Sequence, residues 1–228
     1  MEPIWARPEQ AARGPRPAHS RAAVAAAAVR IADTEGIDAV SMRRVAADLG
    51  AGTASLYRYL ASKDDLLDLM VDAVAREQPP PDPTGDRRAD LRTLADTTRA
   101  VMLRHPWLAA VQASRPNIGP GSLRWLESWL TAVDGLGLDA DEMLTAVDTV
   151  RLFITGAVLG ELAVRASGLD MNRWMAEQGS YGDAIAAGDR YPRVAHVMRE
   201  AKGPHAGDRA ERTFAQGIER ILDGVVAG

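Results

Sequence analysis

Several side chains that can bind nucleic acid are clustered in one stretch of the sequence, residues 41 to 63. Serine, threonine and tyrosine hydroxyls can donate hydrogen bonds to phosphate oxygens, and an arginine can bind guanine O6 and N7 with two parallel bonds. This stretch contains Thr53, Ser55, Tyr57, Arg58 and Lys63. Their types and spacing predict contacts with a DNA duplex.

Two short apolar helices joined by glycines must position these side chains. The first is expected to begin at Ser41 and stop at Gly50, and the second to run from about Thr53 to Leu60. The first helix has an apolar stripe made of Met42, Val45, Ala46 and Leu49. Two short helices with glycine in the turn are the signature of a helix-turn-helix, whose second helix lies in the DNA major groove.

Capping residues and prolines define the neighbouring segments. Ser20 is a good N-cap for a helix that ends at Gly36, and Ser62 caps another with Asp64 in its first turn. Residues 78–86 contain four prolines and cannot continue a helix. We therefore expect a flexible arm over residues 1–19, a helix-turn-helix domain over 20–77 and a larger helical domain over 86–228.

The second domain is also expected to be helical, so the predicted fold class is all-α. A long helix is expected from about Ala140 to Ala166, and the last helix carries apolar residues from Phe214 to Val225 at helical spacing. Residues 167–190 are rich in glycine and polar residues and are expected to form a mobile loop with at most one short helix.

Composition excludes several other classes of protein. The 228 residues are 46% apolar and 25% charged, which is typical of globular proteins. The absence of cysteine excludes disulfides, a thiol nucleophile and cysteine zinc sites. The first 20 residues contain prolines and arginines instead of an apolar signal segment, and the apolar run from Leu152 to Val164 includes Glu161. A soluble, cytoplasmic protein is expected.

Charge is distributed unevenly along the chain. The net charge is -4, but residues 1–60 hold eight arginines against six acidic residues. The excess of negative charge therefore lies in residues 61–228, and the sum does not argue against a nucleic-acid partner.

Two functions from other classes are alternatives. An all-helical enzyme needs a catalytic constellation, but the four histidines show no metal-ligand spacing and the sequence has no G-x-S-x-G elbow or glycine-rich phosphate loop. No cofactor or metal is expected. A helical interaction module without DNA binding remains the second alternative.

The motifs together resemble one family. "SMRRVAADLG", "TASLYRYL" and "SKDDLLD", within residues 20–74, look like the DNA-binding domain of the tetracycline-repressor (TetR) family of transcriptional regulators. "RHPWLAA", "GP" before a tryptophan-bearing helix, "YPRVA" and "FAQGIERILDG" are similar to the ligand-binding domain of its tetracycline-repressor-like branch. The resemblance implies a homodimer that binds a palindromic operator and is released by a small hydrophobic or planar inducer.

The resemblance also implies roles for individual residues at the DNA. Arg43, Thr53, Ala54 and Tyr57 would lie near base edges, and Arg43 would be the main base reader because Thr53 and Ala54 are small. Phosphate contacts are implied for Ser55, Tyr59 and Lys63. Alternatives stay open: either tyrosine can be a packing residue, Arg44 a solvated one, and the arm residues Arg7, Arg13 and Arg16 either reach the minor groove or belong to a disordered tail.

Dimerisation and ligand binding are implied for the second domain. The family's dimer is a four-helix bundle, which here would use Gly156 and Gly160 with the last helix, unless these glycines serve packing within the chain. The last helix would contribute Phe214, Ile218, Ile221 and Leu222.

Three tryptophans suggest a surface that stacks on a planar or greasy ligand, although they can equally be core residues. They are Trp107, Trp125 and Trp129. His105, Gln112 and Arg151 could orient that ligand. Each has a plainer alternative, such as an ion pair between Arg151 and Asp148.

Overall fold

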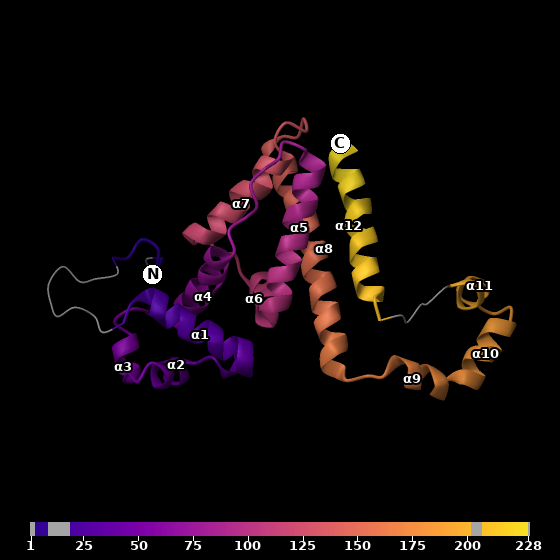
Figure 1. The fold of residues 1–228 in the computed structure, drawn as a ribbon, viewed down its shortest axis with the longest axis horizontal. Helices are drawn as coiled ribbons and strands as arrows, with labels where there is room; N and C mark the ends of the chain where they lie inside the picture. Colours follow the sequence, from indigo (N-terminus) through magenta and orange to yellow (C-terminus); the bar gives the residue numbers. More distant parts are fainter. Residues whose placement is uncertain (1–2, 9–18, 202–206, 228) are drawn as a thin grey trace. The chain divides into compact units, whose positions relative to one another are not determined.

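The computed structural model describes residues 3–8, 19–201 and 207–227, and these residues form helices without any strand (Figure 1). The all-α prediction is confirmed. The first part of the chain contains α1 (Arg21–Glu35), the 3-10 turn η1 (Ile37–Ala39), α2 (Met42–Asp48), α3 (Thr53–Leu56) and α4 (Lys63–Glu77). It is followed by α5 (Arg87–Arg104), α6 (Pro106–Ser114), α7 (Pro120–Val133), α8 (Ala140–Ser167), α9 (Met171–Glu177), α10 (Gly179–Ala187), α11 (Pro192–Glu200) and α12 (Arg209–Ala227).

Three serines begin three of these helices as the sequence predicts. The hydroxyls of Ser20, Ser41 and Ser62 each accept a hydrogen bond from the backbone N–H three residues further on, at 3.1 to 3.2 Å. Each bond satisfies one of the N–H groups that a helix start leaves without a partner. Gly36 ends α1 with φ +86°, a conformation that residues with a side chain rarely adopt.

Two segments differ from the prediction. α3 is one turn long, and residues 57–59 continue it as a turn instead of extending the helix to Leu60. The predicted mobile loop over residues 167–190 is wrong, because α9 and α10 occupy most of it.

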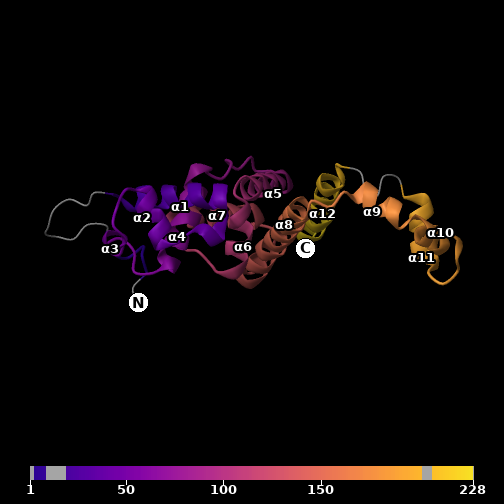
Figure 2. The ribbon, with the colours of Figure 1, turned by 90° about the horizontal axis from the view of Figure 1, so that it is seen from below.

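The chain divides into two compact units, one formed by Met1–Leu159 with Ile218–Gly228 and the other by Gly160–Gly217. In the first unit, α4 packs against α1 on one side and α7 on the other, and α5 packs on α6 and α7 (Figures 1 and 2). The largest fully buried side chains of this unit include Ile31, Leu56, Leu60, Leu66, Met70, Leu91 and Ile154. α4 is therefore the central helix of this unit.

The second unit has a small core. α10 packs on α11, where Ala195 is buried and the Arg199 guanidinium donates to the carbonyl of Ala186. Several of its large apolar side chains are exposed, namely Leu169, Trp174, Tyr181, Tyr191, Val194, Val197 and Met198.

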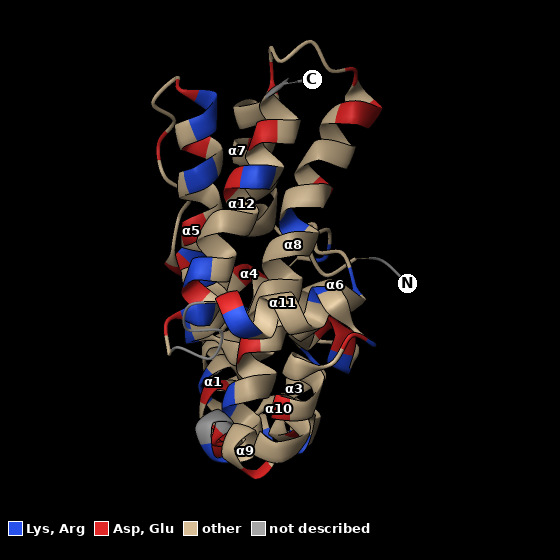
Figure 3. Cartoon of the chain, turned by 90° about the vertical axis from the view of Figure 1, so that its right-hand side faces the viewer, with Lys and Arg blue, Asp and Glu red and all other residues tan. Residues whose placement is uncertain are grey.

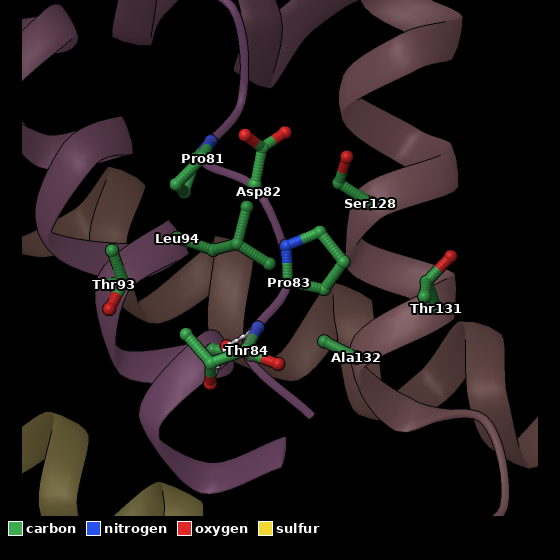
Figure 4. Close-up of a pocket in the computed structure, with 10 residues that line it drawn as sticks. Pro81, Asp82, Pro83, Thr84, Thr93, Leu94, Ser128, Thr131 and Ala132 are labelled. Atoms are coloured by element: carbon green, nitrogen blue, oxygen red, sulfur yellow. Dashed lines mark hydrogen bonds between the residues drawn. The ribbon is translucent and has the colours of Figure 1, made fainter. Parts of the chain in front are cut away.

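The proline-rich segment between α4 and α5 is fixed at its second end. Asp90 accepts hydrogen bonds from the Thr84 hydroxyl at 2.7 Å, the Thr84 N–H at 2.9 Å and the Gly85 N–H at 3.2 Å. The two bonds from Thr84 do most to lower the pKa of Asp90. The segment borders a cavity of about 150 Å³ against α5 and α7 (Figure 4). No helix crosses residues 78–86, where the domain boundary was predicted.

Ion pairs attach α12 to α5 within the first unit. Arg88 binds Glu219 at 2.5 Å and Asp223 at 2.7 Å, and Arg92 also binds Glu219. Hydrogen bonds from Arg88 and Arg92 lower the pKa of Glu219. In Figure 3, α5 carries many charged residues, whereas most of α8 is uncharged.

Candidate DNA-binding surface and ligand cavity

α2 and α3 form a braced helix-turn-helix. Met42, Val45 and Ala46 bury the inner face of α2, and Leu56 of α3 is fully buried. Between the helices, the Ala51 N–H donates to the Ala46 carbonyl at 2.9 Å, and Gly50 has φ +63°. The turn therefore needs a glycine, and the packing fixes the angle between the helices.

The polar residues predicted to contact DNA lie mainly on the outer surface. Arg43, Ala54 and Lys63 are exposed, Tyr57 is 56% exposed, and Thr53 and Ser55 are half-buried. Arg58 is also exposed. The Ser55 hydroxyl donates to the Gly52 carbonyl at 2.6 Å, so a phosphate contact by Ser55 would have to replace this bond. These roles stay predictions.

The two neighbouring arginines of α2 have different surroundings. Arg44 binds Glu35 at 2.6 Å and lies 3.7 Å from Asp48, and the Glu35 hydrogen bond raises its pKa. Within the described part of the chain, Arg43 has no ion pair or hydrogen bond through its side chain. Arg43 is therefore the α2 cation that is available to a base.

The two tyrosines also differ. Tyr59 is 3% exposed, and its hydroxyl accepts a hydrogen bond from the His19 N–H at 3.1 Å. This position favours the packing alternative for Tyr59, because its side chain is buried and its hydroxyl already has a partner. Tyr57, by contrast, points its ring into solvent.

The described part of the predicted flexible arm is packed on the first unit. Ile4 is 1% exposed, and Arg7 binds Asp65 at 2.6 Å. Arg21 donates to the carbonyls of Ile4 and Arg7 at 3.0 and 2.9 Å. The flexible-arm prediction is therefore wrong for residues 3–8, while Arg13 and Arg16 lie outside the described residues.

α4 presents aspartates at intervals of four residues to the segment that joins α6 and α7. Arg115 binds Asp64 and Asp68 at 3.0 Å each, and the Asn117 amide donates to the Asp68 carbonyl at 3.0 Å. The carboxylate of Asp72 accepts the Gly121 N–H at 2.6 Å at the start of α7. This segment is therefore attached to α4 along three turns.

Glycine at position 121 allows this close approach. A Cβ atom there would lie 2.9 Å from the Asp72 backbone oxygen, a distance that side chains do not adopt without displacing the helix. α4 and α7 consequently contact each other with almost no space between their backbones.

A cavity of about 530 Å³ lies beside α4, between α5, α6, α7 and α8. This volume is in the range of small-molecule binding sites. Apolar residues dominate its lining, with Val74, Met102, Leu108, Leu126 and Leu152 among them. The Arg115–Ile118 segment that contacts α4 also lines it.

Four of the six residues predicted to bind a ligand line this cavity: Gln112, Trp125, Trp129 and Arg151. The Trp125 indole N–H donates to the carbonyls of Ala75 and Gln78 at the end of α4, at 3.2 and 3.0 Å. Its ring therefore faces the cavity while its polar edge holds α4. Arg151 lies 3.9 Å from Asp148, as the alternative interpretation anticipates.

The other two residues contact α1 instead. His105 Nδ1 lies 2.9 Å from an Asp33 carboxylate oxygen, and the Trp107 indole N–H donates to the same carboxylate at 2.8 Å. Both side chains are buried, and neither lines the cavity. The structure therefore favours the core interpretation for this pair.

The polar cavity residues that sequence reasoning missed include Thr98, Arg115 and Ser122. Thr98 and Ser122 stand inside helical patterns where hydroxyls are usually solvated, so their spacing gave no signal. Arg115 follows a helix end and reads as a surface residue. One pattern could have indicated Arg115. Asp64 and Asp68 lie four residues apart on one face of α4, and two carboxylates on one face predict a cation on the segment that packs against it.

The predicted dimerisation residues fall into two groups. Gly156 and Gly160 are exposed, and a Cβ atom at either would meet no atom within 4 Å. Phe214, Ile218 and Leu222 are buried within the single chain, and Ile221 is half-buried. The burial of the first three favours a packing role within the chain, and the dimer contacts of all six residues stay predictions.

Two further properties concern metals and membranes. Within residues 3–8, 19–201 and 207–227, no three His, Asp or Glu side chains gather as a metal site. One helix among them, α8, is long and apolar enough to cross a membrane by length and composition. Its buried edge consists of Val147, Val150, Ile154 and Val158, while Leu152 and Val164 are exposed.

A helix-turn-helix followed by a helical domain with an internal cavity defines a class of one-chain regulators that combine DNA recognition with ligand sensing. Comparison with known protein families identifies the family of this chain. Residues 24–70 match the bacterial regulatory proteins of the tetR family, and residues 79–228 match the tetracyclin repressor-like C-terminal domain. The chain belongs to the TetR family of DNA-binding transcription factors, which are not enzymes.

Relatives of known sequence support this membership. The chain is 40% identical to the HTH-type transcriptional repressor DrrR1 of Streptomyces coeruleorubidus over 99% of this chain and 84% of the relative. It is 26% identical to the class A tetracycline repressor protein from transposon 1721 of Escherichia coli, over 87% of each chain.

Solved structures agree. ActR of Streptomyces coelicolor in complex with actinorhodin is similar with a TM-score of 0.78 and 27% identity, over 93% of this chain and 98% of that one. Apo ActR gives a TM-score of 0.77 and 28% identity, over 94% and 98%.

Proposed function

We propose that the protein is a repressor that binds a palindromic operator as a homodimer and is released by a small planar ligand. The observation that carries this proposal is the pairing of an exposed cationic helix-turn-helix with a tryptophan-lined cavity in the same compact unit. The cavity borders α4, and α4 begins at Lys63, beside the DNA-binding surface. A change at the cavity is therefore adjacent to α4, which packs on α1, the helix that contacts α2.

The homodimer is supported by the outer face of α8. Leu152, Gly156, Leu159 and Gly160 form a stripe of small and apolar residues, and Leu152 is 70% exposed. A single short recognition helix covers too few bases to select one site, so two copies on a symmetric site are expected. Exposed stripes of this kind are typical of surfaces that bind another protein copy.

The relatives support both the direction of regulation and the type of ligand. DrrR1 is a repressor, and ActR binds actinorhodin. The cavity has the size for a drug-like molecule, and the rings of Trp125 and Trp129 offer faces on which a planar ligand can stack. Because its target is DNA, the protein is proposed to act in the cytoplasm.

Gel-shift titration with the intergenic DNA beside the gene tests this function. The expected result is one complex containing two copies of the chain, which actinorhodin or a similar planar molecule dissociates. A protein that stays monomeric and fails to bind this DNA at about 50 mM salt would instead support the interaction-module alternative.

A further inference from the structure

Three residues that line the cavity each carry a buried polar group without a hydrogen-bond partner among the described residues. These groups are the Thr98 hydroxyl, the Ser122 hydroxyl and Nε of Arg115. Buried polar groups in folded proteins almost always have partners, so each exception calls for an explanation. All three can donate a hydrogen bond, which indicates that the missing partner supplies oxygen acceptors.

Arg115 connects this cavity to α4 through the other end of its guanidinium. One terminal nitrogen lies 3.0 Å from Asp64, and the other lies 3.0 Å from Asp68. The side chain of Asp68 is 20% exposed, so it depends more on Arg115 than Asp64, which is 75% exposed. Burial raises the pKa of Asp68, and the charge of Arg115 opposes that rise.

The geometry of a guanidinium determines what a ligand would do here. A ligand with two adjacent oxygens binds an arginine best through Nε and one terminal nitrogen, in two parallel hydrogen bonds. Nε is vacant, but both terminal nitrogens already bind α4. A ligand bound in this way must therefore compete with a carboxylate of α4.

We propose that Arg115 is shared between the ligand and α4, and that paired oxygens on an aromatic ring, such as a hydroxyl beside a quinone carbonyl, draw it away from Asp68. The hydroxyls of Thr98 and Ser122 bind further oxygens of the same molecule. Loss of the Arg115 pair frees α4 next to Lys63 and lowers affinity for DNA. This inference rests on the proposed function, and it adds the ligand's chemistry and the residue that transmits its binding.

The test measures ligand binding and DNA release separately. The probe is 1,8-dihydroxyanthraquinone, and 2-aminoanthracene has the same three rings without oxygen. Quenching of tryptophan fluorescence reports binding, since Trp125 and Trp129 line the cavity. Fluorescence anisotropy of labelled intergenic DNA reports release.

In the wild-type protein, the dihydroxyanthraquinone should quench fluorescence and lower DNA affinity at least tenfold, and 2-aminoanthracene should not release DNA. Arg115→Gln should bind the probe roughly tenfold more weakly and, even at saturation, change DNA affinity less than twofold. Asp68→Asn should bind the probe several-fold more tightly, because the probe no longer competes with a carboxylate at position 68 for the Arg115 guanidinium. Arg124→Gln removes an exposed arginine of α7 outside the cavity and should behave as wild type.

The opposite shifts of two neighbouring variants separate this role from a structural one. If Arg115→Gln and Asp68→Asn both weaken the probe, or if saturated Arg115→Gln still releases DNA, the inference is wrong. If Arg115→Gln does not fold, Arg115→Lys replaces it in the test, because lysine keeps the charge but cannot donate two parallel hydrogen bonds. A wild-type protein that binds DNA but not the probe overturns the ligand class alone, whereas one that does not bind DNA overturns the proposed function.

Discussion

Replacing Arg43 with alanine is the sharpest test of the DNA-binding surface. Arg43 is exposed and has no partner within the described residues, so its loss removes no contact of the folded chain. A bidentate contact from arginine to guanine contributes about 1–3 kcal/mol of discrimination. Two copies on a symmetric site would therefore lose about 2–6 kcal/mol, or roughly 30- to 20,000-fold in affinity.

The assay compares binding to the intergenic DNA with binding to a scrambled sequence of equal length. In Arg43→Ala, the ratio of the affinity for intergenic DNA to the affinity for scrambled DNA should fall close to one. The midpoint temperature of thermal unfolding should stay close to that of wild type. Arg44→Ala is the matched control on the same helix. It breaks the ion pair with Glu35, so it should lower stability slightly and leave the ratio unchanged.

A different outcome would refute the reasoning about these two arginines. If Arg43→Ala keeps the wild-type ratio, base recognition belongs to other residues, and Tyr57 is the next candidate because it is 56% exposed. If Arg44→Ala instead lowers the ratio of the two affinities, the ion pair between Arg44 and Glu35 helps to position the DNA-binding surface.

Three further predictions concern affinity, acid stability and dimerisation. Lys63→Ala should weaken binding to all DNA sequences alike and reduce the slope of log affinity against log salt by about 1 per copy. The Arg7–Asp65 pair should contribute about 2 kcal/mol at neutral pH. Burial acts to raise the pKa of Asp65, but Arg7 and the Ala61 N–H lower it overall. The stability advantage over Asp65→Asn should thus persist above pH about 4 and disappear as the pH falls through the lowered value, as urea unfolding at a series of pH values can check. Gly156→Leu should stabilise the monomer by up to about 1 kcal/mol, because glycine is a poor helix former, and yet shift the dimer to monomer in sedimentation velocity.

Local signals explain why the starts of α1, α2 and α4 and the end of α1 could be predicted from the sequence. Ser20, Ser41 and Ser62 cap their helices through bonds to residues three positions away, and such bonds depend on nothing distant in the chain. The same holds for Gly36, where the backbone conformation itself favours glycine. The helix-turn-helix is built almost entirely from such short-range features.

Contacts between residues far apart in sequence account for the errors. His105 and Asp33 are 72 positions apart, so no local pattern predicts that His105 binds Asp33 instead of lining the cavity. Ile4 does not belong to a helical pattern of apolar residues, so its burial could not be predicted locally. The Arg21 side chain holds this segment through the carbonyls of Ile4 and Arg7. Residues 167–190 are weakly apolar, and their helices form without a large buried face.

The contacts of α4 explain how a small ligand could have a large effect on DNA binding. To lower operator affinity a hundredfold, the ligand must distinguish the two forms of the protein by about 3 kcal/mol. A partly buried, charge-assisted contact such as Arg115 with Asp68 contributes about 1.5–3 kcal/mol, so exchanging it in both copies of a dimer is sufficient. The Gly121 N–H also donates to Asp72. Neither residue lines the cavity, so a ligand there should leave this hydrogen bond intact. α4 would then pivot about its Asp72 end, and the movement would be largest at Lys63, where the DNA contacts begin.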